Sequence, residues 1–211
     1  MVGSSIYTCT PGEYGRLGSV ELVARLCEHS RSQGKRPYAI PVGGSNGLGS
    51  WGYIEGVDEL MSQWKQDAPD HIVFACGSGG TATGIALGMA LFNKVIAKKP
   101  VVHAIGVCDD EDYFYRFVAE IADEMGLVQD ECPTTEDFIR KHLVVHQGKG
   151  LGYARSTPEE LDFVTEFARE TGVVLDPVYS GKALYNFFQL IQTESETFRN
   201  QNILFWHTSG A

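Results

Sequence analysis

Residues 72–84 read Ile-Val-Phe-Ala-Cys-Gly-Ser-Gly-Gly-Thr-Ala-Thr-Gly, an apolar run that breaks into a glycine-rich turn. The apolar residues 72–76 predict a buried strand, and residues 81–99 after the turn predict a helix. Backbone N–H groups in the first turn of a helix have no acceptor within it and lie at the positive end of its dipole. The stretch therefore predicts a binding site for an anion, in particular a phosphate group.

Several ligand classes use such a turn. An ATP-binding loop needs a lysine after its second glycine, and Gly84 is followed by Ile85, which argues against ATP. The Gly-x-Gly-x-x-Ala spacing from Gly77 fits a dinucleotide-binding turn, although the acidic residues after the next predicted strand lie too far along. The hydroxyls of Ser78 and Thr81 suit a single phosphomonoester such as pyridoxal 5′-phosphate. A tight turn without any ligand is the remaining interpretation.

The composition is that of an ordinary globular protein of 211 residues, 43% hydrophobic and 21% charged. A net charge of −10 argues against a nucleic-acid partner or an anionic membrane, because both require clustered basic residues. The sequence contains neither an apolar run long enough to span a bilayer nor the pattern of a signal peptide. We therefore expect a soluble intracellular protein, cytoplasmic unless an organelle houses it.

The five cysteines and six histidines lack the paired spacings of a disulfide framework or a metal site, so we expect neither. The cysteines are Cys9, Cys27, Cys76, Cys108 and Cys132, and the histidines are His29, His71, His103, His142, His146 and His207.

The glycine-rich segment 43–50 marks the expected domain boundary. Before it lie a predicted helix, 19–34, and a short extended piece, 37–42. After it the predicted elements alternate between helix and strand. The helices are 52–66, 81–99, 111–126, 135–141, 158–171 and 181–192, and the strands are 72–76, 101–107, 143–146, 173–175 and 203–207. This alternation predicts an α/β fold with a doubly wound parallel sheet, whose ligands bind at the carboxyl ends of the strands.

Three loops at predicted strand ends have unusual chemistry: 150–153, 176–182 and 207–210. Tyr153 and Tyr179 are candidates to donate a proton or to orient a carboxylate, or else they are loop aromatics that cover the core. The hydroxyl of Thr208 is suited to face a ring nitrogen. Lys182 is either a functional residue or a surface lysine at the end of its turn, and the sequence does not separate these interpretations.

Four segments together resemble the D-cysteine desulfhydrase/1-aminocyclopropane-1-carboxylate deaminase family. They are Pro-Val-Gly-Gly-Ser-Asn at 41–46, the turn at 77–84, Asp-Pro-Val-Tyr-Ser-Gly-Lys at 176–182 and His-Thr-Ser-Gly at 207–210. The resemblance covers nearly the whole chain. It implies a pyridoxal-phosphate enzyme of the tryptophan-synthase-β-like fold, incomplete at the N-terminus, with residues 1–50 as the remnant of a small domain and hinge and 51–211 as the large cofactor-binding domain.

The resemblance also implies roles for particular residues. Those implied to bind the cofactor are Gly77, Ser78, Gly79, Gly80, Thr81, Ser180 and Thr208, with the phosphate held by residues 78–81 and the pyridine nitrogen facing Thr208. Tyr179 and Tyr153 are implied to lie over the substrate. The implied reaction is an α,β-elimination that converts D-cysteine to sulfide, pyruvate and ammonia.

The deaminase branch of the family typically has glutamate at position 180 and leucine at position 208. This chain has Ser180 and Thr208, which favours the desulfhydrase branch. A deaminase, a non-catalytic protein with the same fold and a dinucleotide-binding domain remain the alternatives.

One departure concerns the lysine that binds the cofactor covalently in this family. It lies in an Asn-Lys-x-x-Lys-type motif upstream of the Pro-Val-Gly-Gly-Ser-Asn segment, and none of the eight lysines here has that context. We therefore expect a fragment or truncated product that is nearly inactive alone. We also expect an exposed sheet edge, and therefore either homo-oligomers or association through that edge. The expected small-molecule partner is an amino-acid substrate.

Overall fold

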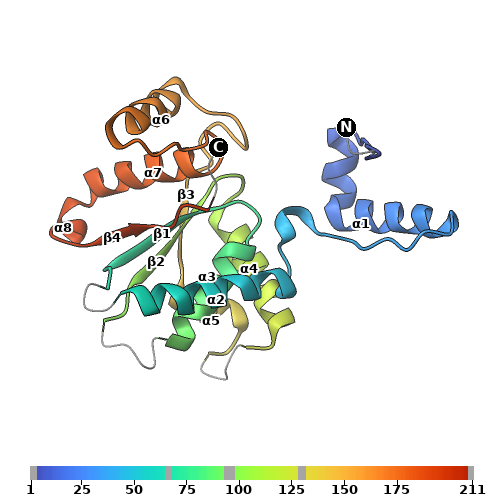
Figure 1. Cartoon of the computed structure of the whole chain (residues 1–211), viewed down its shortest axis with the longest axis horizontal. Coiled ribbons are helices and arrows are strands. Elements are labelled where there is room, and N and C mark those ends of the chain that lie inside the picture. Colours follow the sequence, from blue (N-terminus) through green and yellow to red (C-terminus); the bar gives the residue numbers. More distant parts are fainter. Residues whose placement is uncertain (1–3, 65–67, 93–97, 128–131, 209–211) are drawn as a thin grey trace. The chain divides into compact units, whose positions relative to one another are not determined.

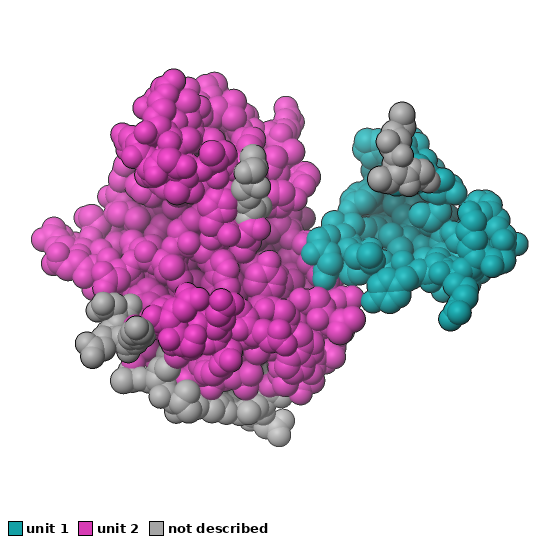
Figure 2. Space-filling model, viewed as in Figure 1, with its two compact units in different colours: residues 1–44 teal, residues 45–211 magenta. Residues whose placement is uncertain are grey.

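The computed structural model describes residues 4–64, 68–92, 98–127 and 132–208. The chain forms two compact units, residues 1–44 and residues 45–211, which Figure 2 shows in separate colours. The division follows Gly44, within the glycine-rich segment. The assignment of residues 1–50 to a smaller domain stays a prediction.

The first unit contains helix α1 (Pro11–Ser32) and a short 3-10 turn, η1 (Val42–Gly44). Helix α1 begins earlier than the predicted residue 19. Thr10, directly before Pro11, forms a capping box with Glu13, and Gly18, with φ of 74°, interrupts the helix shortly before the predicted start. The prediction therefore found only the part of α1 that follows this kink.

The second unit is built on a four-stranded sheet in the order β3-β2-β1-β4, with every pair of neighbours parallel. The strands are β1 (His71–Cys76), β2 (Val101–Gly106), β3 (Val144–Gln147) and β4 (Ile203–Phe205). His71 pairs with Val101 on one side and with Ile203 on the other. The predicted α/β class with a parallel sheet is confirmed.

Helices cover both faces of this sheet (Figure 1). One face carries α2 (Gly47–Gln63), α3 (Gly80–Phe92), α4 (Glu111–Met125) and α5 (Thr135–His142). The other carries α7 (Ser180–Thr193) and α8 (Ser195–Phe198), with α6 (Pro158–Thr171) packed against α7. Strand β1 is buried throughout because alternate side chains enter the two cores: Ile72 and Phe74 face α2–α5, and Val73 and Ala75 face α7.

Further predicted elements differ from the structure. Residues 173–175 form no strand: Val173 and Val174 are exposed, and no strand pairs with them. Helix α2 begins at Gly47 rather than at residue 52, because the side chain of Asn46 caps it by accepting a hydrogen bond of 2.8 Å from Gly49 N. Of the predicted helix 81–99, the structure describes a helix as far as Phe92. Residues 93–97 lie outside the described residues, and Lys98 and Lys99 are not helical.

Three histidines on neighbouring strands form a hydrogen-bonded row across the sheet. His71 Nδ1 lies 2.9 Å from His103 Nε2, and His103 Nδ1 lies 2.8 Å from His146 Nε2. Phe187 of α7 and Phe198 of α8 pack against His103. Burial lowers the pKa of all three, that of His103 to about 3, so the row is uncharged at neutral pH.

Within the described ranges, no helix combines the length and the apolarity needed to cross a membrane. The same residues contain no group of three side chains placed to hold a metal ion.

Candidate cofactor-binding site

The glycine-rich turn connects β1 to α3, as the sequence predicts. Gly79 has a φ of 85°, in the left-handed region that glycine adopts without strain. A side chain on Gly77 would bring its Cβ to 2.7 Å from Cε1 of Tyr179, so glycine is what allows the tyrosine ring to lie against the turn. Gly77 and Tyr179, about a hundred residues apart in the sequence, therefore meet at the carboxyl end of β1.

The start of α3 offers donors for an anion. Ser45 Oγ donates to Ser78 Oγ at 2.8 Å and accepts from Gly80 N at 3.0 Å, which ties the start of the second unit to the turn. The amides of Thr81 and Ala82 have no acceptor among the described residues, although Ala82 is fully buried. A buried N–H group without a partner, as at Ala82, is costly, and a bound phosphate would satisfy it together with the amide of half-buried Thr81. These residues fit the phosphate of pyridoxal phosphate.

Tyr179 is held by a network centred on Asp176. The Asp176 carboxylate accepts hydrogen bonds from the amides of Val178 (2.8 Å), Tyr179 (2.6 Å) and Ser180 (2.9 Å). It also accepts from Ser180 Oγ at 2.6 Å, and that oxygen in turn accepts from Asp176 N at 2.9 Å. The Ser180 side chain is thus buried and engaged with Asp176, and its predicted contact with the cofactor stays a prediction.

The two predicted tyrosines lie together. Their hydroxyl oxygens are 2.5 Å apart and their rings meet edge to face. The hydrogen bond to Tyr153, followed by burial, raises the pKa of Tyr179 to about 12. The Tyr179 phenol therefore keeps its proton at neutral pH and can donate a hydrogen bond.

The two cysteines next to the turn are neutral thiols. Burial raises the pKa of Cys76 to about 12 and raises that of Cys108 as well. Cys108 Sγ donates to the carbonyl oxygen of Gly77 at 2.9 Å. These thiols support the turn and are not activated as nucleophiles.

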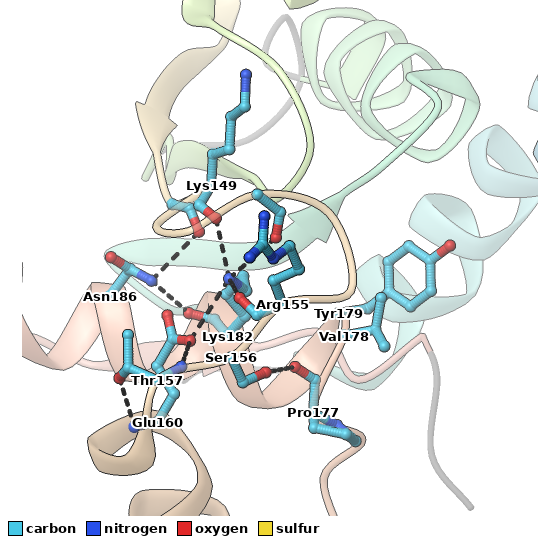
Figure 3. A network of polar contacts seen from close by, with 12 residues as sticks. Lys149, Arg155, Ser156, Thr157, Glu160, Pro177, Val178, Tyr179, Lys182 and Asn186 are labelled. Carbon is cyan, nitrogen blue, oxygen red and sulfur yellow. Dashed lines mark hydrogen bonds and ion pairs between the residues drawn. The ribbon is translucent and has the colours of Figure 1, made fainter. Parts of the chain in front are cut away.

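Lys182 is not a surface lysine. Its side chain is fully buried, and its ammonium group contacts Glu160 and the backbone of residues 149–155, as Figure 3 shows. The surface interpretation is therefore wrong. The local sequence gives no sign of this burial, because the partners lie more than twenty residues away.

Thr208 is exposed and follows β4 along the chain. Its neighbour His207 donates from Nε2 to the carbonyl oxygen of Val174 at 3.1 Å. Ser209 and Gly210 of the predicted segment lie outside the described residues. The role of Thr208 at a ring nitrogen stays a prediction.

Ser45 and Asp176 were not among the predicted site residues, although both belong to segments that carry the resemblance. Ser45 follows two glycines and Asp176 precedes Pro-Val-Tyr. These are positions where short polar side chains commonly fix a turn.

Comparison with known proteins defines the class. The sequence pattern of the PALP family, described as "Pyridoxal-phosphate dependent enzyme", matches residues 1–209, so the chain belongs to this family. The chain is 44% identical over 214 residues to the bifunctional D-cysteine desulfhydrase/1-aminocyclopropane-1-carboxylate deaminase, mitochondrial, of Arabidopsis thaliana. It is 33% identical over 213 residues to a putative 1-aminocyclopropane-1-carboxylate deaminase of Thermotoga maritima.

A solved structure supports the fold. The crystal structure of an ACC deaminase homologue superposes with a TM-score of 0.68 at 27% identity, over 98% of this chain and 58% of that one. The Arabidopsis and Thermotoga relatives are matched along all of this chain, which covers 50% and 62% of their lengths. The chain thus spans between half and two thirds of the proteins it resembles, and the tryptophan-synthase-β-like, pyridoxal-phosphate type of fold is confirmed.

Proposed function

We propose that this chain forms the cofactor-binding part of a pyridoxal-phosphate lyase that eliminates sulfide from D-cysteine. The observation that carries the proposal is the turn before α3, where the amides of Thr81 and Ala82 are unpartnered among the described residues and Tyr179 lies against Gly77. The Arabidopsis relative is named for activity on both D-cysteine and 1-aminocyclopropane-1-carboxylate, so D-cysteine is one of the two substrates that this similarity supports. The same activity is proposed for the whole protein of which this chain is a part.

The residues from Ser78 to Ala82, supported by Ser45, would hold the phosphate through amides and hydroxyls. The bound cofactor supplies an electron-withdrawing ring that stabilises negative charge on the α-carbon of an amino acid. The chain itself fixes the phosphate and thereby the position of the reacting group.

Tyr179 would supply the proton that accompanies loss of sulfur. Its phenol is protonated at neutral pH, and Tyr153 holds its hydroxyl in place through the bond of 2.5 Å. In the elimination the α-carbon loses its proton, and the electron pair of that bond forms the Cα–Cβ double bond. The departing sulfur takes the pair of the Cβ–S bond and accepts the proton from Tyr179 Oη, which is left as a phenolate until solvent protonates it again. Tyr153, which is half exposed, would orient the substrate from the solvent side.

The environment of Ser180 favours D-cysteine over 1-aminocyclopropane-1-carboxylate. Its side chain is only 1% exposed and its hydroxyl bonds the Asp176 carboxylate. A glutamate at this position, as the deaminase branch typically has, would place a second carboxylate against Asp176 in a buried space. Serine thus matches the rest of this site, and glutamate does not.

The test supplies pyridoxal phosphate and either amino acid to the longest protein that the reading frame encodes, and measures sulfide and ammonia. We expect sulfide and ammonia in equal amounts from D-cysteine, and at least about tenfold slower ammonia release from 1-aminocyclopropane-1-carboxylate. Faster ammonia release from the latter would support the deaminase instead. Cofactor binding without consumption of either amino acid would support a non-catalytic protein.

A further inference from the structure

Lys182 lies in the first turn of α7, with its side chain completely buried. A buried ammonium group is costly unless its donors are satisfied. Here Nζ donates to the carbonyl oxygens of Lys149 and Arg155, both at 2.9 Å, and lies 3.5 Å from that of Gly152. Figure 3 shows the Lys149 and Arg155 carbonyls beside the ammonium group.

Glu160 provides the opposite charge. Its Oε2 lies 3.4 Å from Lys182 Nζ, and it is nearly as buried as the lysine. The same oxygen accepts from Thr157 N at 2.9 Å, which completes the capping box at the start of α6. Glu160 therefore joins α6 to the ammonium group, at the point where the loop ends.

The loop from Gly148 to Thr157 has little support of its own. Gly150, Gly152 and Ala154 all have positive φ, and for Ala154, at 57°, this conformation is unfavourable. Within the described residues, its internal backbone bonds are those from Gly152 N to Lys149 O and from Arg155 N to Gly152 O. The carbonyls that Lys182 binds lie on both sides of Tyr153, so the ammonium fixes the loop around that residue.

We propose that Lys182 is a positioning residue that holds Tyr153 against Tyr179. The chain of contacts runs from the ammonium to the carbonyls of the loop, then from Tyr153 Oη to Tyr179 Oη, and from the Tyr179 ring to Gly77 of the glycine-rich turn. This proposal rests on the proposed function, because that function assigns the catalytic roles of Tyr153 and Tyr179. Lys182 itself meets backbone carbonyls and Glu160, and it does not act on the substrate.

The test separates this role from a merely structural one by two variants. Lys182→Met keeps the apolar stem and removes the charge, which leaves Glu160 buried without its partner. Lys182→Met/Glu160→Gln also removes that unpaired charge, while glutamine can still accept from Thr157 N. We expect the double variant to regain most of the melting temperature that the single variant loses, but not the order of the loop.

Order in the loop is read in two ways. Amide exchange in residues 148–157 should be at least about tenfold faster in both variants, with exchange in β1 unchanged in the double variant. The ¹⁹F resonance of 3-fluorotyrosine at position 153 should move to the value it has when Tyr179 is replaced by phenylalanine. A control, Lys149→Ala, removes a lysine side chain and keeps the Lys149 carbonyl, so both readouts should match the parent protein.

The proposal is overturned if the double variant keeps a protected loop and the parent ¹⁹F shift. Neither readout requires the cofactor. Binding of 4′-deoxypyridoxine 5′-phosphate, measured separately on the parent protein, tests the proposed function, so failure of the one proposal is distinguishable from failure of the other.

Discussion

At the scale of single residues, Tyr179 carries the proposed proton transfer. Replacing it with phenylalanine keeps the ring that lies against Gly77 and removes the hydroxyl that Tyr153 contacts. We expect Tyr179→Phe to slow sulfide release from D-cysteine by about 10²-fold or more, the usual contribution of general acid catalysis. Binding of 4′-deoxypyridoxine 5′-phosphate should not change, which calorimetry measures.

Tyr185→Phe is the matched control, because Tyr185 lies on α7 against Phe163 of α6. It should release sulfide at the parent rate. Equal rates in the Tyr179 variant and this control would contradict a proton-donating role for Tyr179.

Single residues also show how far the sequence could predict the site. Tyr153 and Tyr179 were predicted because aromatic residues beside glycine and serine stand out in loops, and the structure brings their hydroxyls together. Lys182 was missed as a buried residue because its partners are backbone carbonyls of a distant loop, and every residue except proline carries the same backbone groups. No sequence pattern distinguishes such a partner.

At the scale of elements, the start of α7 depends on Asp176. The helix has no side-chain cap from Tyr179, and the Asp176 carboxylate instead accepts from the amides of Val178, Tyr179 and Ser180. We expect Asp176→Ala to lower the free energy of unfolding by about 1–2 kcal/mol, as the loss of a helix cap does. Urea unfolding measures this change.

Thr134→Ala, at the cap of α5, gives a reference for the loss of one capping bond. Within the described part of the chain, the Thr134 side chain accepts one backbone hydrogen bond, from Asp137 N. Asp176→Ala should be the more destabilising of the two. A smaller effect than that of Thr134→Ala would contradict the account of how α7 begins.

The histidine row makes the sheet sensitive to acid. The pKa of His103 is about 3 in the folded chain and about 6.5 in an unfolded one, so the unfolded state binds more protons as the pH falls below 6.5. The contribution of His103 to the free energy of unfolding is complete above pH 6.5 and is lost progressively toward pH 3. Between pH 7.5 and pH 5 we expect His103 to account for a loss of about 2 kcal/mol.

Urea unfolding at the two pH values measures this loss. In His103→Leu the difference between pH 7.5 and pH 5 should shrink by that amount, even if the variant is less stable throughout. His29→Gln, at an exposed histidine of α1, should keep the parent's pH dependence. The same pH dependence in His103→Leu and in the parent would show that the row does not control acid stability.

The elements that the sequence predicted well have local causes. Strand β1 is a continuous apolar run, and α6 begins at a capping box with proline, where the structure confirms both. The apolar residues 173–175 look like a strand, but a strand requires a neighbour to pair with, and the topology provides none there. Helix α2 was predicted too late because its first turn is rich in glycine, while the cap at Asn46 decides its start.

At the scale of the whole molecule, β4 ends the sheet on one side. Within the described residues it pairs with β1 alone, so its other edge presents unpaired backbone groups. We expect the chain to associate through this edge, seen as a sedimentation coefficient that rises with concentration. Ile203→Lys should weaken the association by placing a charge on the edge strand.

Val101→Lys is the matched control, because Val101 is similarly exposed, at 42% against 38% for Ile203, but lies on the interior strand β2. It should associate as the parent does. A chain that sediments as a monomer at every concentration would contradict this prediction.

The central claim is that the turn between β1 and α3 holds the phosphate of the cofactor. The most direct test is calorimetric titration with 4′-deoxypyridoxine 5′-phosphate, which lacks the aldehyde and so cannot react with surface lysines, beside the same compound without its phosphate. We predict one site for the phosphate ester, weakened by about tenfold or more in Ser78→Ala/Ser45→Ala, and no measurable binding of the compound without phosphate. Equal binding of both compounds, or of neither, would contradict the claim.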